Sequence, residues 1–98
     1  MVLGGLDTRA AEDFAMRMAR EIRDSMPPID QLPGKKEIGK RARKIDRVVA
    51  QAKAFSRANR LNFYKKAKLA NTLRWQLKEA GYPDVFIEEM VRVVAVNL

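Results

Sequence analysis

Between residues 35 and 78 the chain carries fifteen lysine and arginine residues but only two acidic ones, which gives this segment a net charge of +13. The segments before and after it carry −2 and −3, so the whole 98-residue chain carries +8 at pH 7. Side chains of one sign at this density repel each other, and phosphate groups neutralise them readily. The charge distribution therefore indicates a polyanionic partner.

Four of these cations follow one line along the helix predicted over residues 35–58. At 100° per residue their directions fall within about 60° of one another, and a fifth cation flanks them. The four in line are Lys36, Lys40, Arg43 and Arg47, and the flanking one is Lys44. Such a row can follow a phosphate backbone. The alternatives are a solvated face with no partner or a basic helix on a membrane surface, and the alanine-rich opposite side weakens the membrane alternative.

A second group of side chains shares one face of the helix predicted over residues 62–80. It consists of Tyr64, Lys68, Asn71, Trp75 and Lys78, with Lys65 further round the helix. Aromatic rings between cations can stack on single-stranded or flipped bases, and Lys68 and Asn71 could bond base edges in a groove. The sequence nevertheless favours core packing for both rings, because a central helix needs two apolar faces. The main apolar face expected here consists of Phe63, Ala67, Ala70 and Leu77.

The connection over residues 56–62 is a third candidate, because it holds two arginines and two asparagines. Arg57 and Arg60 could contact phosphate, together with the N-terminal amides of the next helix. Asn59 and Asn62 are more simply explained as helix caps.

The residue types leave little for catalysis. The chain has no cysteine and no histidine, which removes thiolate chemistry, disulfides, zinc fingers and the commonest general base near neutral pH. Ser25 and Ser56 therefore have no histidine to activate them. Gly4, Gly5 and Gly34 lack the spacing of a phosphate-binding loop. We expect a protein that is not an enzyme and that uses no cofactor and no metal.

The elements that would position these residues are helices. Capping residues, proline and glycine predict helices over about residues 8–25, 35–58, 62–80 and 84–97. A proline-rich linker over residues 27–34 separates the first two, and Ile29 and Leu32 within it could pack on the core. We favour a break near Asn59–Asn62 over one long helix, and a final helix over an isolated strand. The sequence thus predicts a single all-α domain, a small bundle of three to four helices.

The sequence predicts a small basic helical protein that binds nucleic acid mainly through phosphate contacts, with DNA favoured over RNA. The nucleic-acid-binding residues expected are Lys36, Lys40, Arg43, Lys44, Arg47, Arg57, Arg60, Lys65, Lys68, Asn71 and Trp75. No apolar run approaches the ~20 residues that span a bilayer and no secretory signal is visible, so we expect no membrane role and a cytoplasmic location.

The alternative is a protein-interaction module or homodimeric adaptor with no role in nucleic-acid binding. Its interface would be the last helix or an apolar seam on the second one, and its basic segment could meet an acidic protein. That seam, whose positions step by four and three residues, consists of Ile38, Ala42, Ile45, Val49 and Ala52.

Overall fold

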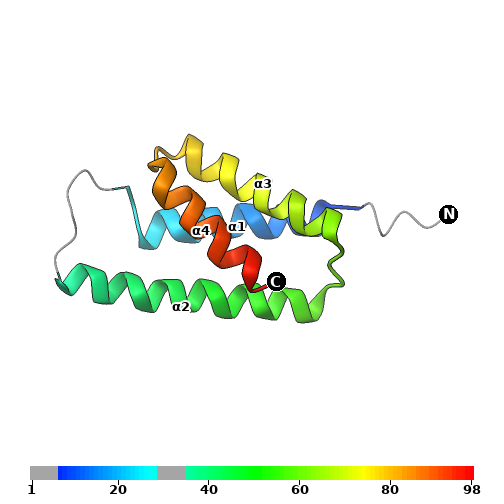
Figure 1. Ribbon diagram of the computed structural model, residues 1–98, viewed down its shortest axis with the longest axis horizontal. Coiled ribbons are helices and arrows are strands. Elements are labelled where there is room, and N and C mark those ends of the chain that lie inside the picture. The colour runs from blue at the N-terminus through cyan, green and yellow to red at the C-terminus, as the bar shows by residue number, and fades with distance from the viewer. Residues whose placement is uncertain (1–6, 29–34) are drawn as a thin grey trace.

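The structure, a computed structural model, describes residues 7–28 and 35–98, with the side chains of residues 35–38 outside the description. It contains four helices, α1 (Arg9–Ser25), α2 (Lys35–Ala58), α3 (Phe63–Glu79) and α4 (Asp84–Val96). They form a small all-α bundle in which α1 and α4 lie between α2 and α3 (Figure 1). The predicted fold class is confirmed, and every helix lies within one residue of its expected bounds. The expected packing of Ile29 and Leu32 falls outside the described residues.

The helix α1 forms the centre of the bundle because apolar residues recur on one side of it every three or four positions. That side is buried and consists of Ala11, Phe14, Ala15, Met18, Ala19 and Ile22. The small alanines let α3 approach closely, and α1 packs more extensively on α3 than on any other helix. The leucines of α3 that face the core, Leu69, Leu73 and Leu77, are completely buried.

The helix α2 is turned differently from the sequence expectation. Its buried residues are Val48, Ala52 and Phe55, whereas Ile45 and Val49 are half-buried and Ala42 is exposed. The predicted seam was therefore wrong by a rotation of about 70° around the helix axis. The cause is Phe55, whose ring stacks on Phe14 of α1 with the centroids 4.2 Å apart. The side chain of Ile38, also placed in that seam, lies outside the description.

The buried face of α3 also differs from the expectation. Phe63 and Ala67 are exposed, while Leu69 and Leu73, outside the predicted face, are buried with Leu77. The favoured core packing of Tyr64 and Trp75 is wrong as well, since 53% and 63% of their surfaces are exposed. The three leucines, spaced four residues apart, already fill the contact with the core.

A buried tyrosine joins the turn between α3 and α4 to the end of α1. Gly81 has a positive φ of 92°, which favours glycine, and the chain then places Tyr82 in the core. The Tyr82 hydroxyl donates to the carbonyl oxygens of Met26 at 2.6 Å and Ile22 at 3.2 Å. Its ring stacks on Phe86 of α4 with centroids 4.6 Å apart. Tyr82 therefore holds three helices at one corner and satisfies carbonyls that end α1.

Replacing Tyr82 with phenylalanine should lower the free energy of unfolding by about 1–2 kcal/mol, because the buried Met26 carbonyl loses its donor. Urea denaturation followed by circular dichroism measures this change. The matched control is Tyr64→Phe, which removes an exposed hydroxyl and should change stability by less than about 0.5 kcal/mol. Equal effects of the two variants would refute the role given to the Tyr82 hydroxyl.

Burial also raises the pKa of the Tyr82 phenol above its ordinary value of 10.0. The stability that the neutral phenol contributes is therefore complete below pH 10 and is lost as the pH rises through the raised pKa. The stability difference between the native protein and Tyr82→Phe should consequently shrink when urea denaturation is repeated above pH 10. A difference that stays constant up to complete deprotonation would contradict this linkage.

Candidate nucleic-acid interface

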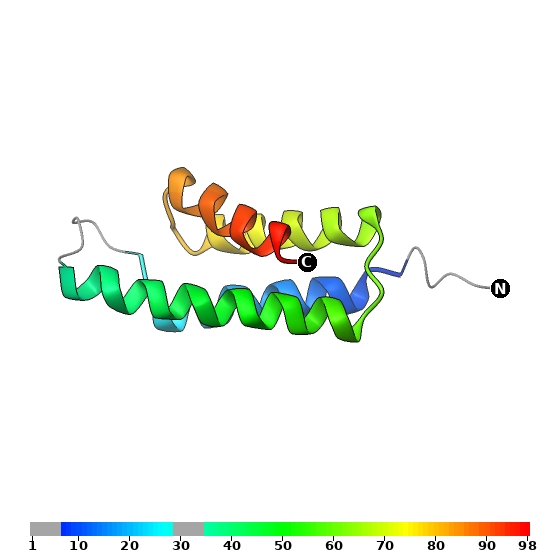
Figure 2. The same ribbon diagram turned by 60° about the horizontal axis from the view of Figure 1, so that its bottom comes forward.

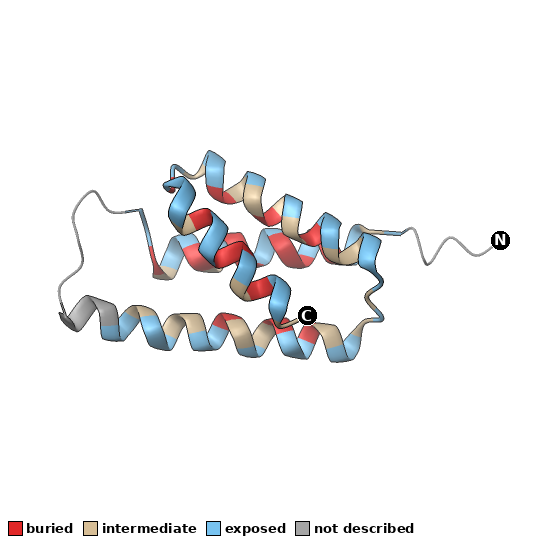
Figure 3. Cartoon of the chain, in the orientation of Figure 1, coloured by how far each residue is buried: buried red, intermediate tan, exposed pale blue. Residues whose placement is uncertain are grey.

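The outer side of α2 presents three exposed cations in line, Lys40, Arg43 and Arg47, here called the cation row. They are three and four residues apart and span about 10 Å along the helix. Within the described residues, none of the three lies within 4.0 Å of a carboxylate. The exposed side of α2 is visible along its whole described length (Figure 3). The backbone of α2 carries Lys36 at one end of this line, but its side chain lies outside the description.

Lys44 has a different environment from the cation row. Its side chain is half-buried, and its Nζ donates to the carbonyl oxygen of Ser25, the last residue of α1. A lysine at this place satisfies a free carbonyl and interacts favourably with the negative end of the helix dipole. The structure therefore gives Lys44 a structural contact with α1, which distinguishes it from the exposed row that it was expected to flank.

Two further exposed cations follow, Arg57 in the last turn of α2 and Arg60 in the connection to α3. The asparagines beside them act as caps, because Asn59 Nδ2 donates to the Phe55 carbonyl at 3.1 Å and Asn62 Oδ1 accepts from the Lys65 amide at 2.8 Å. The first turn of α3 contains no acidic residue, so its positive dipole end adds to the local positive potential. Lys65 is half-buried there, and its Nζ donates to the Arg60 carbonyl at 3.5 Å.

The predicted residues of α3 lie on the side of that helix that faces away from the core. Lys68, Asn71 and Trp75 are all exposed. Lys68 lies 3.8 Å from Glu12 of α1, and Asn71 Oδ1 accepts from Arg74 Nη1 at 2.9 Å. Since the backbones of α2 and α3 do not approach each other closely in the described residues, the predicted site residues are divided between two surfaces joined by the 59–62 connection. A single continuous site is therefore not formed.

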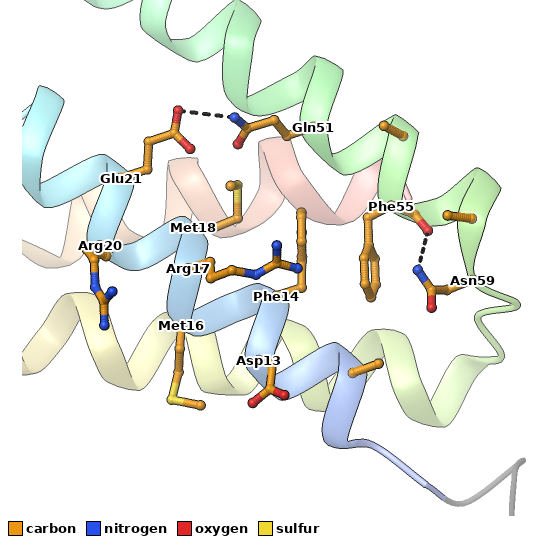
Figure 4. Close-up of a pocket in the computed structure, with 13 residues that line it drawn as sticks. Asp13, Phe14, Met16, Arg17, Met18, Arg20, Glu21, Gln51, Phe55 and Asn59 are labelled. Carbon is orange, nitrogen blue, oxygen red and sulfur yellow. Dashed lines mark hydrogen bonds between the residues drawn. The ribbon is translucent and has the colours of Figure 1, made fainter.

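Sequence reasoning missed a groove between α1 and the second half of α2 (Figure 4). Phe14 and Phe55 form its apolar part, and the Arg17 guanidinium lies 5.7 Å from the centre of the Phe14 ring. Gln51 Nε2 donates to Glu21 at 3.2 Å, whereas its buried Oε1 has no hydrogen-bond partner among the described residues. The charged residues that line the groove balance, because Arg17 and Arg20 offset Asp13 and Glu21. The one sequence signal for this groove was Phe55, a large apolar residue of the second helix that lies outside the predicted seam.

The residues predicted to bind nucleic acid did not include Lys53, which is exposed on α2 nearer its C-terminal end than the cation row. Its position within the basic segment of residues 35–78 could have identified it as a candidate.

In the described part of the chain, no helix has both the length and the apolar character needed to cross a bilayer. Comparison with protein-family models, with curated proteins and with solved structures finds no match to this chain.

Exchanging Lys44 for glutamine should lower the free energy of unfolding by about 0.5–1 kcal/mol, because the C-terminal carbonyl of α1 loses a charged donor. Lys40→Gln, which removes the same charge from an exposed position on the same helix, should change it by less than about 0.5 kcal/mol. Thermal and urea denaturation provide the comparison. If Lys40→Gln destabilises the protein as much as Lys44→Gln, the Ser25 contact has no special role.

Proposed function

We propose that this protein binds nucleic acid, with DNA favoured over RNA, through phosphate contacts made by exposed cations of α2 and the connection that follows it. The observation that carries this proposal is the cation row, Lys40, Arg43 and Arg47, which is exposed and has no carboxylate partner in the described residues. A helical row of this kind can lie along a nucleic-acid backbone and contact several of its phosphates.

Charge pairing elsewhere in the bundle supports this assignment by contrast. Arg9 pairs with Asp7, Lys68 with Glu12, Arg74 with Glu88 and Arg92 with Glu89. The Arg9 pair is close enough to lower the pKa of Asp7 to about 2. Four cations outside α2 thus have a carboxylate partner, whereas the three of the cation row have none among the described residues. An external polyanion would remove the repulsion that remains there.

The placement of α2 makes the row accessible. Among the described side chains, α2 contributes three of the eighteen that are buried and apolar, so much of its described circumference faces solvent. Its first turns extend beyond the neighbouring helices (Figure 2). A rod exposed in this way can approach a phosphate backbone without rearrangement of the bundle.

The alternative function is a protein-interaction module, and the burial of several of its expected interface residues argues against it. It relied on apolar residues of α2 and α4, but Ala52, Met90 and Val94 are buried within the bundle itself. Those residues are therefore occupied by the intramolecular core and cannot also cover a partner.

Phosphate contacts fix the position of a protein on nucleic acid but do not read base sequence. We therefore expect binding that depends strongly on salt and weakly on sequence. If Lys40, Arg43, Arg47, Arg57 and Arg60 each neutralise one phosphate, log K should fall with log salt concentration at a slope of about −4 to −5 on duplex DNA.

Replacing all three residues of the cation row with glutamine should bring that slope to about −2, because three phosphate contacts are removed. Fluorescence anisotropy with labelled duplex DNA over a series of salt concentrations measures it. The matched control, Arg9→Gln with Arg20→Gln and Arg92→Gln, removes the same net charge elsewhere and should leave the slope within about one unit of the native value. Equal losses in both variants would indicate attraction by net charge alone, and an unchanged slope in the first would refute the proposed surface.

A further inference from the structure

The exposed aromatic rings of this protein are concentrated on α3. Of the seven aromatic residues, Phe14, Phe55 and Tyr82 are buried and Phe86 is half-buried. The remaining three, Phe63, Tyr64 and Trp75, are 88%, 53% and 63% exposed and all belong to α3. Trp75 is the only tryptophan in the chain, and the fold leaves most of its surface in contact with water.

Two of these rings lie on one straight line with polar side chains between them. The line is Tyr64, Lys68, Asn71 and Trp75, with steps of four, three and four residues, so Tyr64 and Trp75 are about 16 Å apart along the helix. We call this line the aromatic row. It lies on the side of α3 opposite Leu69, Leu73 and Leu77, and that side is exposed (Figure 3).

Neighbouring helices hold the polar side chains of the aromatic row in place. Glu12 of α1 lies 3.8 Å from Lys68, and Thr8 Oγ1 donates to the same carboxylate at 3.0 Å. On the other side, Glu88 of α4 accepts from Arg74 Nε at 2.9 Å, and Arg74 in turn donates to Asn71 Oδ1. Asn71 therefore has its amide N–H groups available to donate, from a position between the two rings.

This combination fits a ligand that offers both flat rings and negative charge. Unpaired bases stack on aromatic side chains, and their phosphates attract lysines, whereas the bases of a duplex keep their faces covered. A second copy of this chain would place lysines against lysines, and protein interfaces are depleted in lysine. Lys78, exposed beyond Trp75, extends the positive charge of the row.

We infer that the aromatic row of α3 binds single-stranded nucleic acid by stacking unpaired bases on Tyr64 and Trp75. The inference rests on the proposed nucleic-acid function and deepens it, because it names unpaired strands as the class of ligand for this surface. The cation row lies on a separate helix, α2, whose described backbone does not closely approach that of α3, so the two surfaces can be tested independently.

Trp75 itself reports occupancy, because no other tryptophan contributes to the emission. Titration with an oligothymidine strand should quench Trp75 fluorescence, whereas a blunt duplex of equal charge should bind with little quenching. Binding of oligothymidine without quenching would overturn the inference and leave the proposed function of the cation row intact.

Substitutions then separate base stacking from apolar packing. Trp75→Leu should weaken binding of fluorescein-labelled oligothymidine about tenfold, as expected for the loss of one stacked base, while Trp75→Phe should retain most of the affinity. Duplex binding should change less than twofold in both variants. Equal affinities of the Leu and Phe variants for the single strand would overturn the inference.

Two further measurements identify which proposal fails. Light scattering measures the oligomeric state of the native protein and of Trp75→Leu. If the native protein is a dimer and Trp75→Leu is a monomer, the aromatic row is an interface between two copies of the chain, and the inference is overturned. In the variant that lacks the cation row, Trp75 quenching by oligothymidine should persist. If quenching persists in this variant and its affinity for duplex DNA equals that of the native protein, the proposed role of the cation row is refuted and the inference for the aromatic row is supported.

Discussion

The stack between Phe14 of α1 and Phe55 of α2, with centroids 4.2 Å apart, fixes the rotation of α2 about its own axis. With Phe55 turned inward, Val48 and Ala52 follow it into the core, since they lie seven and three positions earlier, respectively, on the same side. The same rotation directs Lys40, Arg43 and Arg47 to solvent and brings Lys44 to the end of α1. One aromatic contact thus decides which cations of α2 serve the fold and which are free for a partner.

The basic segment is consequently less uniform than its charge suggests. Arg41 lies over the ring of Phe86, Lys44 bonds the end of α1, and Arg74 bridges α4 and Asn71. These side chains use their long apolar stems and their donors to connect helices, as basic residues in small bundles often do. Among the described cations of the segment, those with no such contact include Lys40, Arg43 and Arg47 on the outer side of α2, Arg57 at its end and Arg60 in the connection to α3. The basic segment therefore contains cations that connect helices beside cations that face solvent, and the sequence alone does not separate the two groups.

The sequence was sufficient to predict where the helices begin and end, but not which side of α2 and α3 is buried. Local backbone chemistry sets the helix bounds: α1 ends before Met26 and Pro27, and the turn over Gly81–Pro83 separates α3 from α4. The bounds were therefore predictable to one residue. The rotation of α2 depends on Phe14, which is distant in sequence, and alanine-rich periodicity fits several rotations equally well. Trp75 was assigned to the core because a central helix was expected to need two apolar faces, but the leucines of α3 already fill the contact with the core. Sequence alone could name the candidate residues but could not divide them between two surfaces.

The small share of α2 in the core has a consequence for the dynamics of the bundle. Among its described side chains α2 has three that are buried and apolar, and its like charges repel each other, so we expect it to open locally more readily than the other helices. Its amide hydrogens would exchange with solvent through partial opening that leaves the α1, α3 and α4 core intact. A polyanion bound only to closed α2 would suppress that opening, since binding to one state shifts the equilibrium toward it. The helix that presents the charge is thus also the one whose order a ligand can change most.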